Sequence, residues 1–176
     1  MKERVVVDEE RFKQMMESLC KMLVDSGVGK EDALVGIHRR GVVIARRLFA
    51  MIEQAGGIAP LFGSVDITLY RDDLRSIGPQ PVLHSTNLPF DVEGRRIILV
   101  DDVIYTGRTV RAALSVLLDY GRPKKVELAV LVDRGNRELP IQPDYAVLKL
   151  KTEPNEFVEV MVREVDGQDG VKVIRR

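Results

Sequence analysis

The chain has few of the residues and runs that mark exported, membrane-spanning or metal-binding proteins. Its single cysteine, Cys20, excludes an internal disulfide and fits a reducing compartment. With only two histidines, His38 and His84, it lacks a Cys/His cluster with metal-ligand spacing. No apolar stretch approaches the roughly 20 residues that span a bilayer. Because the first residues, Met1 to Arg4, are charged and lead into a helical pattern rather than an apolar signal core, we expect a cytoplasmic protein.

An excess of charge of either sign is also missing, since 27 basic side chains balance 27 acidic ones. Dedicated nucleic-acid binders usually carry an excess of Lys and Arg, so composition gives RNA binding no support, although a local basic patch can suffice. The remaining composition, 45% hydrophobic and 31% charged over 176 residues, is ordinary for a soluble globular protein. This length, with no repeat or linker, predicts a single domain over residues 1–176.

The hydrophobic pattern alternates between strand and helix. Apolar residues recur at helical spacing over 8–26, 41–54 and 109–120. Short apolar or alternating runs predict strands over 33–37, 61–69, 96–100, 126–132 and 145–148, and further strands or a hairpin over 157–176. Residues 70–89 lack any periodicity, and a loop of this length is usually functional or mobile. The alternation predicts an α/β fold with a mainly parallel sheet flanked by helices.

The segment after the predicted strand 96–100 has the composition of a sugar-phosphate site. The turn from Thr106 to Thr109 precedes a helix, whose first N–H groups lack intrahelical partners and whose dipole favours an anion. Gly107 lets the backbone approach a phosphate closely. Asp101 and Asp102 at the strand end are acceptors suited to two sugar hydroxyls or to the waters of a Mg²⁺ ion.

Each half of this segment also has a simpler interpretation. An aspartate pair at a strand end occurs in phosphotransfer receiver domains and haloacid-type phosphatases, or caps a turn. A Thr-Gly pair before a helix can be an ordinary N-cap. The combination is more specific, because the acids and the turn would contact different groups of one ligand. The segment is not a P-loop, since the chain has no G-x-x-x-x-G-K-[ST].

This segment resembles the signature with which type I phosphoribosyltransferases bind 5-phosphoribosyl-1-pyrophosphate (PRPP). It consists of Ile97, Ile98, Leu99, Val100, Asp101, Asp102, Val103, Ile104, Tyr105, Thr106, Gly107, Arg108 and Thr109. Together with Asp-Ile-Thr-Leu-Tyr-Arg-Asp-Asp-Leu at 66–74 and Leu-Ala-Val-Leu-Val-Asp-Arg-Gly at 128–135, it is similar to the PyrR family of bifunctional pyrimidine-operon attenuation proteins. The likeness covers most of the chain. It implies the type I phosphoribosyltransferase fold, with a small hood and a long flexible loop.

The resemblance implies a role for each matching residue of the PRPP site. The turn from Thr106 to Thr109 would bind the 5′-phosphate. Asp101 and Asp102 would hold the ribose hydroxyls and, through water, a Mg²⁺ ion. Arg71 opens the long loop and would bring positive charge to the leaving pyrophosphate as the loop closes and excludes water. Without the family, the Arg-Asp-Asp run at this loop could equally be a solvated surface.

Two further sites follow from the resemblance. Pyrophosphate would lie against the loop after the first predicted helix and strand, formed by His38, Arg39, Arg40 and Gly41. PyrR relatives commonly carry Thr in place of Arg39, and this departure could alter the affinity for pyrophosphate. The alternative interpretation is that these arginines are ordinary surface charge at the start of a helix. Asp133 and Arg134 are the implied base-binding residues, with Asp133 accepting the N3–H of uracil. The rival interpretation is a local ion pair between these two.

The implied activity is that of a glycosyltransferase, a uracil phosphoribosyltransferase that converts uracil and PRPP into UMP and pyrophosphate. Its transition state would resemble an oxocarbenium ion, so catalysis would depend on orientation and on neutralising the leaving group with Mg²⁺ and arginine. Tyr105 stands where many purine enzymes of this fold carry an acid, and we assign no general base. The alternatives are transfer to another base, such as a purine, and a UMP-sensing regulator with vestigial catalysis.

PyrR proteins also bind the leader RNA of pyrimidine genes and assemble as dimers or larger homo-oligomers, and the resemblance implies both properties. Candidate transcript contacts are Arg11, Lys13, Lys21 and Arg137, although ordinary surface charge explains them equally well. The chain departs from its relatives on this side at Glu17, Ser18, Asn136, Gln142 and the segment 149–154. Either this protein recognises RNA through different residues, or its regulatory function has weakened while its enzymatic activity is retained. Met15 and Met16 on the first helix fit either an interface or the core.

Overall fold

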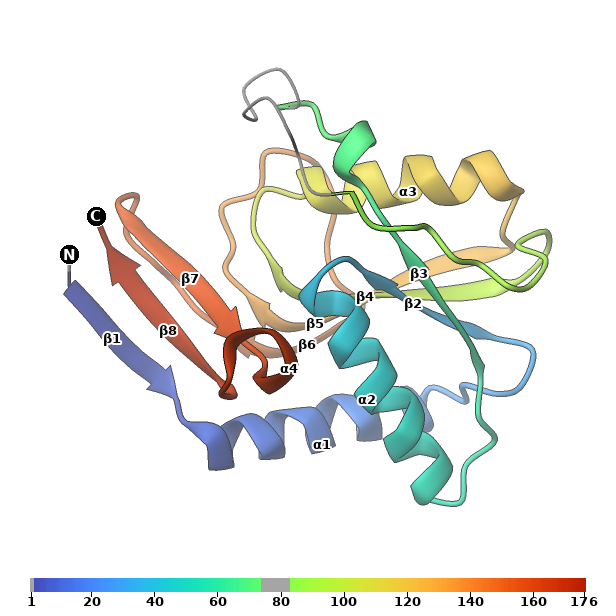
Figure 1. Ribbon diagram of the computed structural model, residues 1–176, viewed down its shortest axis with the longest axis horizontal. Helices are drawn as coiled ribbons and strands as arrows, with labels where there is room; N and C mark the ends of the chain where they lie inside the picture. The colour runs from blue at the N-terminus through green and yellow to red at the C-terminus, as the bar shows by residue number, and fades with distance from the viewer. Residues whose placement is uncertain (1, 74–82) are drawn as a thin grey trace.

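The computed structural model describes residues 2–73 and 83–176 (Figure 1). Five parallel strands form the larger sheet, in the order β3-β2-β4-β5-β6. They are β2 (Ala33–Ile37), β3 (Leu61–Val65), β4 (Arg96–Ile104), β5 (Lys125–Asp133) and β6 (Tyr145–Lys149). Helices α1 (Glu9–Asp25) and α2 (Arg40–Gln54) cover one face, and α3 (Arg108–Tyr120) covers the other. The predicted parallel α/β architecture is confirmed.

The central strand β4 shows why its sequence is a nearly continuous apolar run. Ile98 and Val100 pack into the cluster formed with α1 and α2, whereas Ile97 and Leu99 pack into the cluster formed with α3. All four side chains are fully buried. A strand covered by helices on both faces needs apolar side chains at every position, because neither face meets water.

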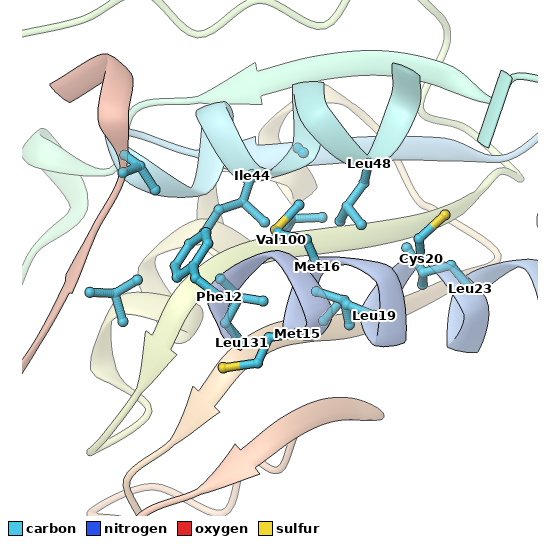
Figure 2. Close-up of a cluster of buried hydrophobic side chains, with 14 of the residues drawn as sticks. Phe12, Met15, Met16, Leu19, Cys20, Leu23, Ile44, Leu48, Val100 and Leu131 are labelled. Atoms are coloured by element: carbon cyan, nitrogen blue, oxygen red, sulfur yellow. The ribbon is translucent and has the colours of Figure 1, made fainter. Parts of the chain in front are cut away.

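Helix α1 forms as its capping residues and periodicity predict. The Asp8 carboxylate accepts the backbone N–H of Arg11 at 2.9 Å, which caps the first turn. Figure 2 shows its apolar face, including Phe12, Met15 and Met16, packed against α2 and the sheet. Both methionines are therefore core residues, which decides between the two interpretations left open for them.

The chain ends form a second, antiparallel sheet in the order β1-β8-β7, from β1 (Lys2–Val7), β7 (Glu156–Met161) and β8 (Gly170–Arg175). With the short helix α4 (Arg163–Asp166), these strands make up the hood. The expected strands in the C-terminal tail are confirmed, whereas strand β1, which precedes the predicted helix over 8–26, was not predicted. Two arginines of α2 hold the hood in place by ion pairs: Arg40 with Asp166, and Arg47 with Glu164 and Asp169.

Two element boundaries differ from prediction in ways that shape the site. Strand β4 runs on to Ile104 and so includes Asp101 and Asp102. The strand expected over 61–69 ends at Val65. A 3-10 turn, η1 (Thr68–Tyr70), follows because the Asp66 carboxylate accepts both the N–H and the hydroxyl of Thr68. The predicted loop 70–89 lies partly outside the described residues, at 74–82.

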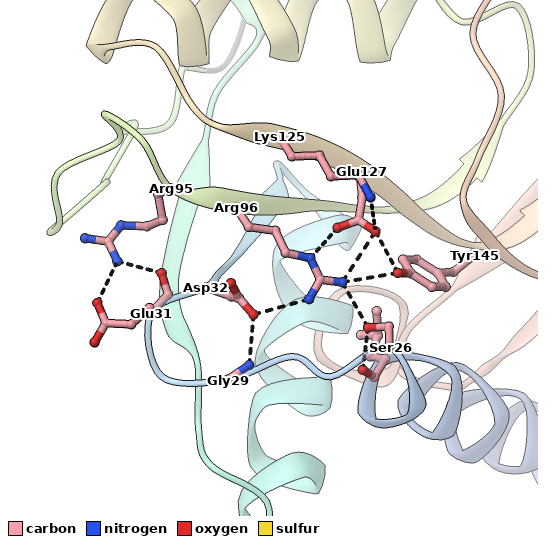
Figure 3. A network of polar contacts seen from close by, with 10 residues as sticks. Ser26, Gly29, Glu31, Asp32, Arg95, Arg96, Lys125, Glu127 and Tyr145 are labelled. Carbon is pink, nitrogen blue, oxygen red and sulfur yellow. Dashed lines mark hydrogen bonds and ion pairs between the residues drawn. The ribbon is translucent and has the colours of Figure 1, made fainter.

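At the N-terminal ends of β4 and β5, a polar network surrounds Arg96 (Figure 3). Its guanidinium pairs with Glu127, donates to the Ser26 hydroxyl at 3.0 Å and lies 3.3 Å from the Asp32 carboxylate. The Tyr145 hydroxyl donates to Glu127 at 2.8 Å. This network lies at the opposite end of the sheet from the predicted PRPP residues. None of the helices in the described ranges is long and apolar enough to cross a membrane.

Candidate functional site

The predicted site residues meet at the C-terminal edge of the parallel sheet, where two adjoining cavities share Arg71 and Thr109. One, of about 340 Å³, is also lined by Asp72, Asp73, Thr106 and Arg108. The other, of about 280 Å³, is also lined by His38, Arg39, Arg40, Asp101 and Asp102. The fold thus brings together three segments that are well separated along the chain.

The turn before α3 has the geometry of an anion cradle. Gly107 adopts φ +94°, a left-handed conformation that residues with a side chain rarely occupy. No side chain caps the helix, and the N–H of Arg108 reaches only Thr106 Oγ1, at a long 3.3 Å. The N–H groups of the first turn and the helix dipole are therefore directed at the cavity, as a phosphate requires.

The acid pair lies beside this turn, with Asp101 buried and Asp102 half-buried. Asp101 is 7% exposed, and its Oδ1 accepts the N–H of Asp102 at 2.9 Å. Burial raises the pKa of Asp101 well above its ordinary value, and the charge of Asp102 raises it further. Burial also raises the pKa of Asp102, although hydrogen bonds and Arg40 oppose this. The pair therefore holds a proton more readily than two free carboxylates, and a bound cation would displace it.

These carboxylates fit a Mg²⁺ ion that is shared with a ligand. Within residues 2–73 and 83–176 no group of three or more His, Cys, Asp or Glu side chains is arranged to hold a metal. Mg²⁺ is usually bound by one or two carboxylates, with substrate phosphates and water completing its shell. Two adjacent acids beside an anion cradle, Asp101 buried and Asp102 half-buried, would supply the protein's share of such a site.

The pyrophosphate loop packs tightly against β4. A Cβ on Gly41 would lie 2.4 Å from the Val100 carbonyl oxygen, so only glycine fits there. Arg39 is exposed at the cavity, whereas Arg40 donates to Asp166 of the hood at 2.6 Å and 3.0 Å. Of the two arginines, Arg39 is the one whose side chain is presented to a ligand.

His38 reveals a neighbour that sequence reasoning missed. Its ring stacks on that of His84, with centroids 4.7 Å apart and planes 5° apart. The backbone N–H of His84 donates to Asp66 at 2.7 Å. Burial lowers the pKa of His38, and the neighbouring His84 lowers it further. His84 lies in the aperiodic loop segment, where no sequence pattern marks it.

The cations of the phosphate cavity are paired with nearby carboxylates. Arg71 donates to both oxygens of Asp73, at 2.8 Å and 2.6 Å. Arg108 donates to Asp72 and to Glu138, each at 2.6 Å. Sequence analysis noted Asp72 and Asp73 only as part of the Arg-Asp-Asp run, and it did not place Glu138 beside Arg108.

At the end of β5, Asp133 forms an ion pair with Arg137 at 2.9 Å. The Asp133 carboxylate also accepts the N–H of Gly135 at 2.9 Å. The local pair between Asp133 and Arg134 is therefore not formed. The Arg134 side chain instead donates to the Thr152 hydroxyl at 2.9 Å and to a backbone carbonyl of the hood. A direct contact between Arg134 and a base would have to replace these bonds.

The candidate RNA contacts fall in different environments. Arg11 and Lys13 are exposed on α1, and Lys21 pairs with Asp25 at 2.7 Å on the same helix. The Arg137 side chain is only 12% exposed and also donates to the carbonyl oxygens of Tyr105 and Ile141, so it braces the site itself.

Comparison with known proteins agrees with this geometry. The phosphoribosyl transferase domain model matches residues 6–164. The bifunctional protein PyrR of Clostridium novyi is 47% identical over 173 residues, covering 98% of this chain and 97% of that protein. The PyrR protein of Deinococcus radiodurans is 44% identical over 169 residues, covering 96% and 92%.

Solved structures share the fold. A hypoxanthine-guanine phosphoribosyltransferase from Bacillus anthracis superposes with a TM-score of 0.71 at 16% identity, covering 100% of both chains. A hypoxanthine phosphoribosyltransferase from Staphylococcus aureus has a TM-score of 0.70 at 20% identity, covering 98% of this chain and 92% of that one. The predicted type I phosphoribosyltransferase fold is confirmed, and the chain belongs to the phosphoribosyltransferase family and, within it, to the PyrR family.

Proposed function

We propose that this protein is a uracil phosphoribosyltransferase, which transfers the phosphoribosyl group of PRPP to uracil and releases UMP and pyrophosphate. The observation that carries the proposal is the adjacent pair of the buried Asp101 and the half-buried Asp102 beside the left-handed turn at Gly107. This arrangement offers acceptors for two sugar hydroxyls and donors for a phosphate at adjacent positions. Membership of the PyrR family supports uracil as the acceptor base.

In the proposed complex the turn from Thr106 to Thr109 binds the 5′-phosphate, and the acid pair holds the ribose hydroxyls. Arg39 and Arg71 face the leaving pyrophosphate from two sides of the second cavity. Mg²⁺, when bound, would neutralise further charge on that group. The bond from C1′ to the pyrophosphate oxygen breaks as N1 of uracil bonds to C1′, and the N1 proton passes to the departing pyrophosphate or to water. Oriented charges stabilise the cationic sugar between the two groups.

The base would lie beyond β5, near the Asp133 carboxylate. Its ion pair with Arg137 fixes one of the carboxylate oxygens of Asp133. A carboxylate can accept the N3–H of uracil but cannot donate to a base that presents only acceptors there. This difference is the basis for the expected preference for uracil over cytosine.

A panel of bases tests the proposed activity. The protein with PRPP and Mg²⁺ is expected to release pyrophosphate with uracil and not with cytosine, hypoxanthine or guanine. Product identity is checked by chromatography of UMP, with omission of Mg²⁺ as the control. Turnover with a purine and none with uracil would contradict the proposal and show that the acceptor is another base. No turnover with any base would also contradict it and would favour a UMP-sensing regulator with vestigial catalysis.

We also propose that the protein binds the leader RNA of pyrimidine genes in a UMP-dependent manner, as a homo-oligomer in the cytoplasm. The family membership and the exposed Arg11 and Lys13 on α1 support this proposal. These two side chains lie outside the PRPP cavities, whereas Arg137 contacts the site. RNA binding and catalysis can therefore be separated by substitution.

Replacing Arg11 and Lys13 by alanine is expected to weaken RNA binding and to reduce its salt slope by about one for each phosphate that is no longer neutralised, with catalysis unchanged. Arg137→Ala is expected to weaken both RNA binding and catalysis, because it also releases Asp133. Filter binding with and without UMP measures these effects, and the exposed Lys30→Ala serves as the control. Unchanged RNA affinity in the Arg137 variant would show that Arg137 does not contact the transcript.

A further inference from the structure

Arg134 is a buried cation with an unusual set of partners. It is 7% exposed, and its guanidinium donates to the Thr152 hydroxyl at 2.9 Å and to the Glu156 carbonyl. The guanidinium carbon also lies 3.8 Å from the ring centroid of Tyr105 and 5.7 Å from that of Phe157. Within residues 2–73 and 83–176, no carboxylate lies within ion-pair distance of it. Its charge is offset by neutral oxygens and aromatic faces.

Arg134 and its partners belong to three separate parts of the fold. Arg134 itself follows β5, and Tyr105 lies between β4 and the turn at Gly107. Thr152 precedes hood strand β7, and Glu156 and Phe157 are the first residues of that strand. The Arg134 side chain therefore connects the end of β5, beside the proposed base site, both to the predicted phosphate turn and to the hood.

An arginine is suited to this position in a way that an apolar residue is not. Its planar guanidinium can stack on a ring and donate hydrogen bonds in its own plane at the same time. Burying a charge without a carboxylate partner is unfavourable, and an apolar side chain of similar volume would avoid that loss. Arg40, Arg47 and Arg96, which are partly buried as well, each pair with a carboxylate.

Tyr105 connects this arrangement to the predicted phosphate turn, which it immediately precedes in the chain. Its ring is held by Arg134, and its carbonyl oxygen accepts from Arg137 at 3.0 Å. The next two residues, Thr106 and Gly107, form the turn that would receive the 5′-phosphate. A shift of the Tyr105 ring would therefore move the turn, since no flexible segment separates them.

We propose that Arg134 is a positioning residue: without touching PRPP, it fixes Tyr105 and thereby the phosphate turn, and it couples the seating of the 5′-phosphate to the position of hood strand β7. The proposal rests on the proposed function, in that the turn binds the phosphate of PRPP. If Arg134 is a positioning residue, its substitution weakens the binding of PRPP. If Arg134 contacted the base, its substitution would weaken the binding of uracil instead.

The test compares Arg134→Lys with a matched arginine at the other end of the sheet. Lysine keeps the charge but cannot stack and form both hydrogen bonds, so the KM for PRPP is expected to rise about tenfold. The KM for uracil and kcat are expected to change by less than about threefold, the range left to indirect effects. Arg95, which stacks over Phe90 at 5.7 Å and donates to the Asp91 and Glu31 carbonyls, provides the control. Arg95→Lys is expected to leave every kinetic constant unchanged.

A double-mutant cycle with Tyr105→Leu identifies the route of the effect. If Arg134 acts through Tyr105, the double variant is expected to be no worse than the more affected single variant. Strictly additive losses, an unchanged KM for PRPP, or a loss confined to the KM for uracil would each overturn the proposal. Should Arg134→Lys fail to fold, Tyr105→Leu, at an exposed position, is still expected to raise the KM for PRPP.

Calorimetric titration with Mg²⁺ and PRPP separates this idea from the proposed activity. Weaker PRPP binding by Arg134→Lys than by the parent protein supports the positioning role whichever base is used. A parent protein that binds PRPP but does not use uracil refutes the proposed activity alone. Equal PRPP affinity in the two proteins refutes the positioning role alone.

Discussion

Replacing Asp101 and Asp102 together by asparagine is expected to lower kcat/KM by about 10³-fold or more, the scale on which oriented charged groups act in a dry site. Asparagine keeps the shape and one oxygen of each side chain but removes the two negative charges. The ribose hydroxyls then lose their strong acceptors, and Mg²⁺ loses its carboxylates. Steady-state kinetics with uracil and PRPP measure the loss, and Asp25→Asn on the exposed face of α1 is the control. Undiminished turnover would refute the role of the pair.

The same variant is expected to be more stable than the parent protein at neutral and higher pH. The pKa of Asp101 is raised in the folded state, so its stabilising effect is present at low pH and is lost as the pH rises through that raised pKa. Asparagine does not titrate, and this loss should disappear. Thermal unfolding between pH 5 and about 9 checks the sign. Equal pH dependence in both proteins would mean that the pair is not strained by its burial.

Arg96→Met is expected to lower the free energy of unfolding by about 3 kcal/mol, at the lower end of the range for breaking a buried ion pair. The substitution leaves Glu127, whose side chain is 5% exposed, without its main cation. Lys125, 3.3 Å from Glu127, and the Tyr145 hydroxyl remain and limit the loss. Urea unfolding measures it. Arg95→Met removes two bonds to backbone carbonyls, the contact with the Phe90 ring and an exposed ion pair with Glu31 at 3.7 Å. It is expected to have about a third of this effect, because exposed ion pairs and ordinary hydrogen bonds contribute little.

The pH dependence of the parent protein provides a second measurement on the same network. Arg96 and the Tyr145 hydroxyl lower the pKa of Glu127 from its ordinary 4.5 to about 2, against the effect of burial, which would raise it. This contribution is fully present above the ordinary pKa and is lost as the pH falls from about 4.5 towards about 2. Glu127→Gln is expected to flatten that part of the curve. If the parent protein and the Glu127→Gln variant lose the same stability as the pH falls, the titrating groups responsible are residues other than Glu127.

Neither substitution in this network is expected to change the kinetic constants of the folded enzyme. Arg96 and Glu127 lie where β4 and β5 begin, whereas the PRPP residues lie where these strands end. The rigid parallel sheet separates the two ends, so stability and activity can be varied independently. This separation also makes the network a useful reference for variants near the site.

The features that sequence analysis predicted correctly are those with local signals. The Asp8 cap and the spacing of Phe12, Met15 and Met16 specify α1 without reference to the rest of the chain. The turn at Gly107 is recognisable because the strand before it, the acids and the helix after it are contiguous. Sequence analysis predicted no element for 2–7, because β1 is stabilised by pairing with β8 from the other end of the chain and not by a local signal.

The amino-acid order alone therefore determined the α/β alternation, the position of the anion cradle and the acid pair beside it, since each depends on neighbours within one or two turns. Tertiary structure decided which charges meet. It paired Asp133 with Arg137, placed His84 on His38 and set Arg134 beneath Tyr105. Such partners are brought together by the packing of strand ends and loops that are distant in the chain. An arginine, aspartate or histidine can pair with many kinds of side chain, so its identity does not indicate which partner it will meet.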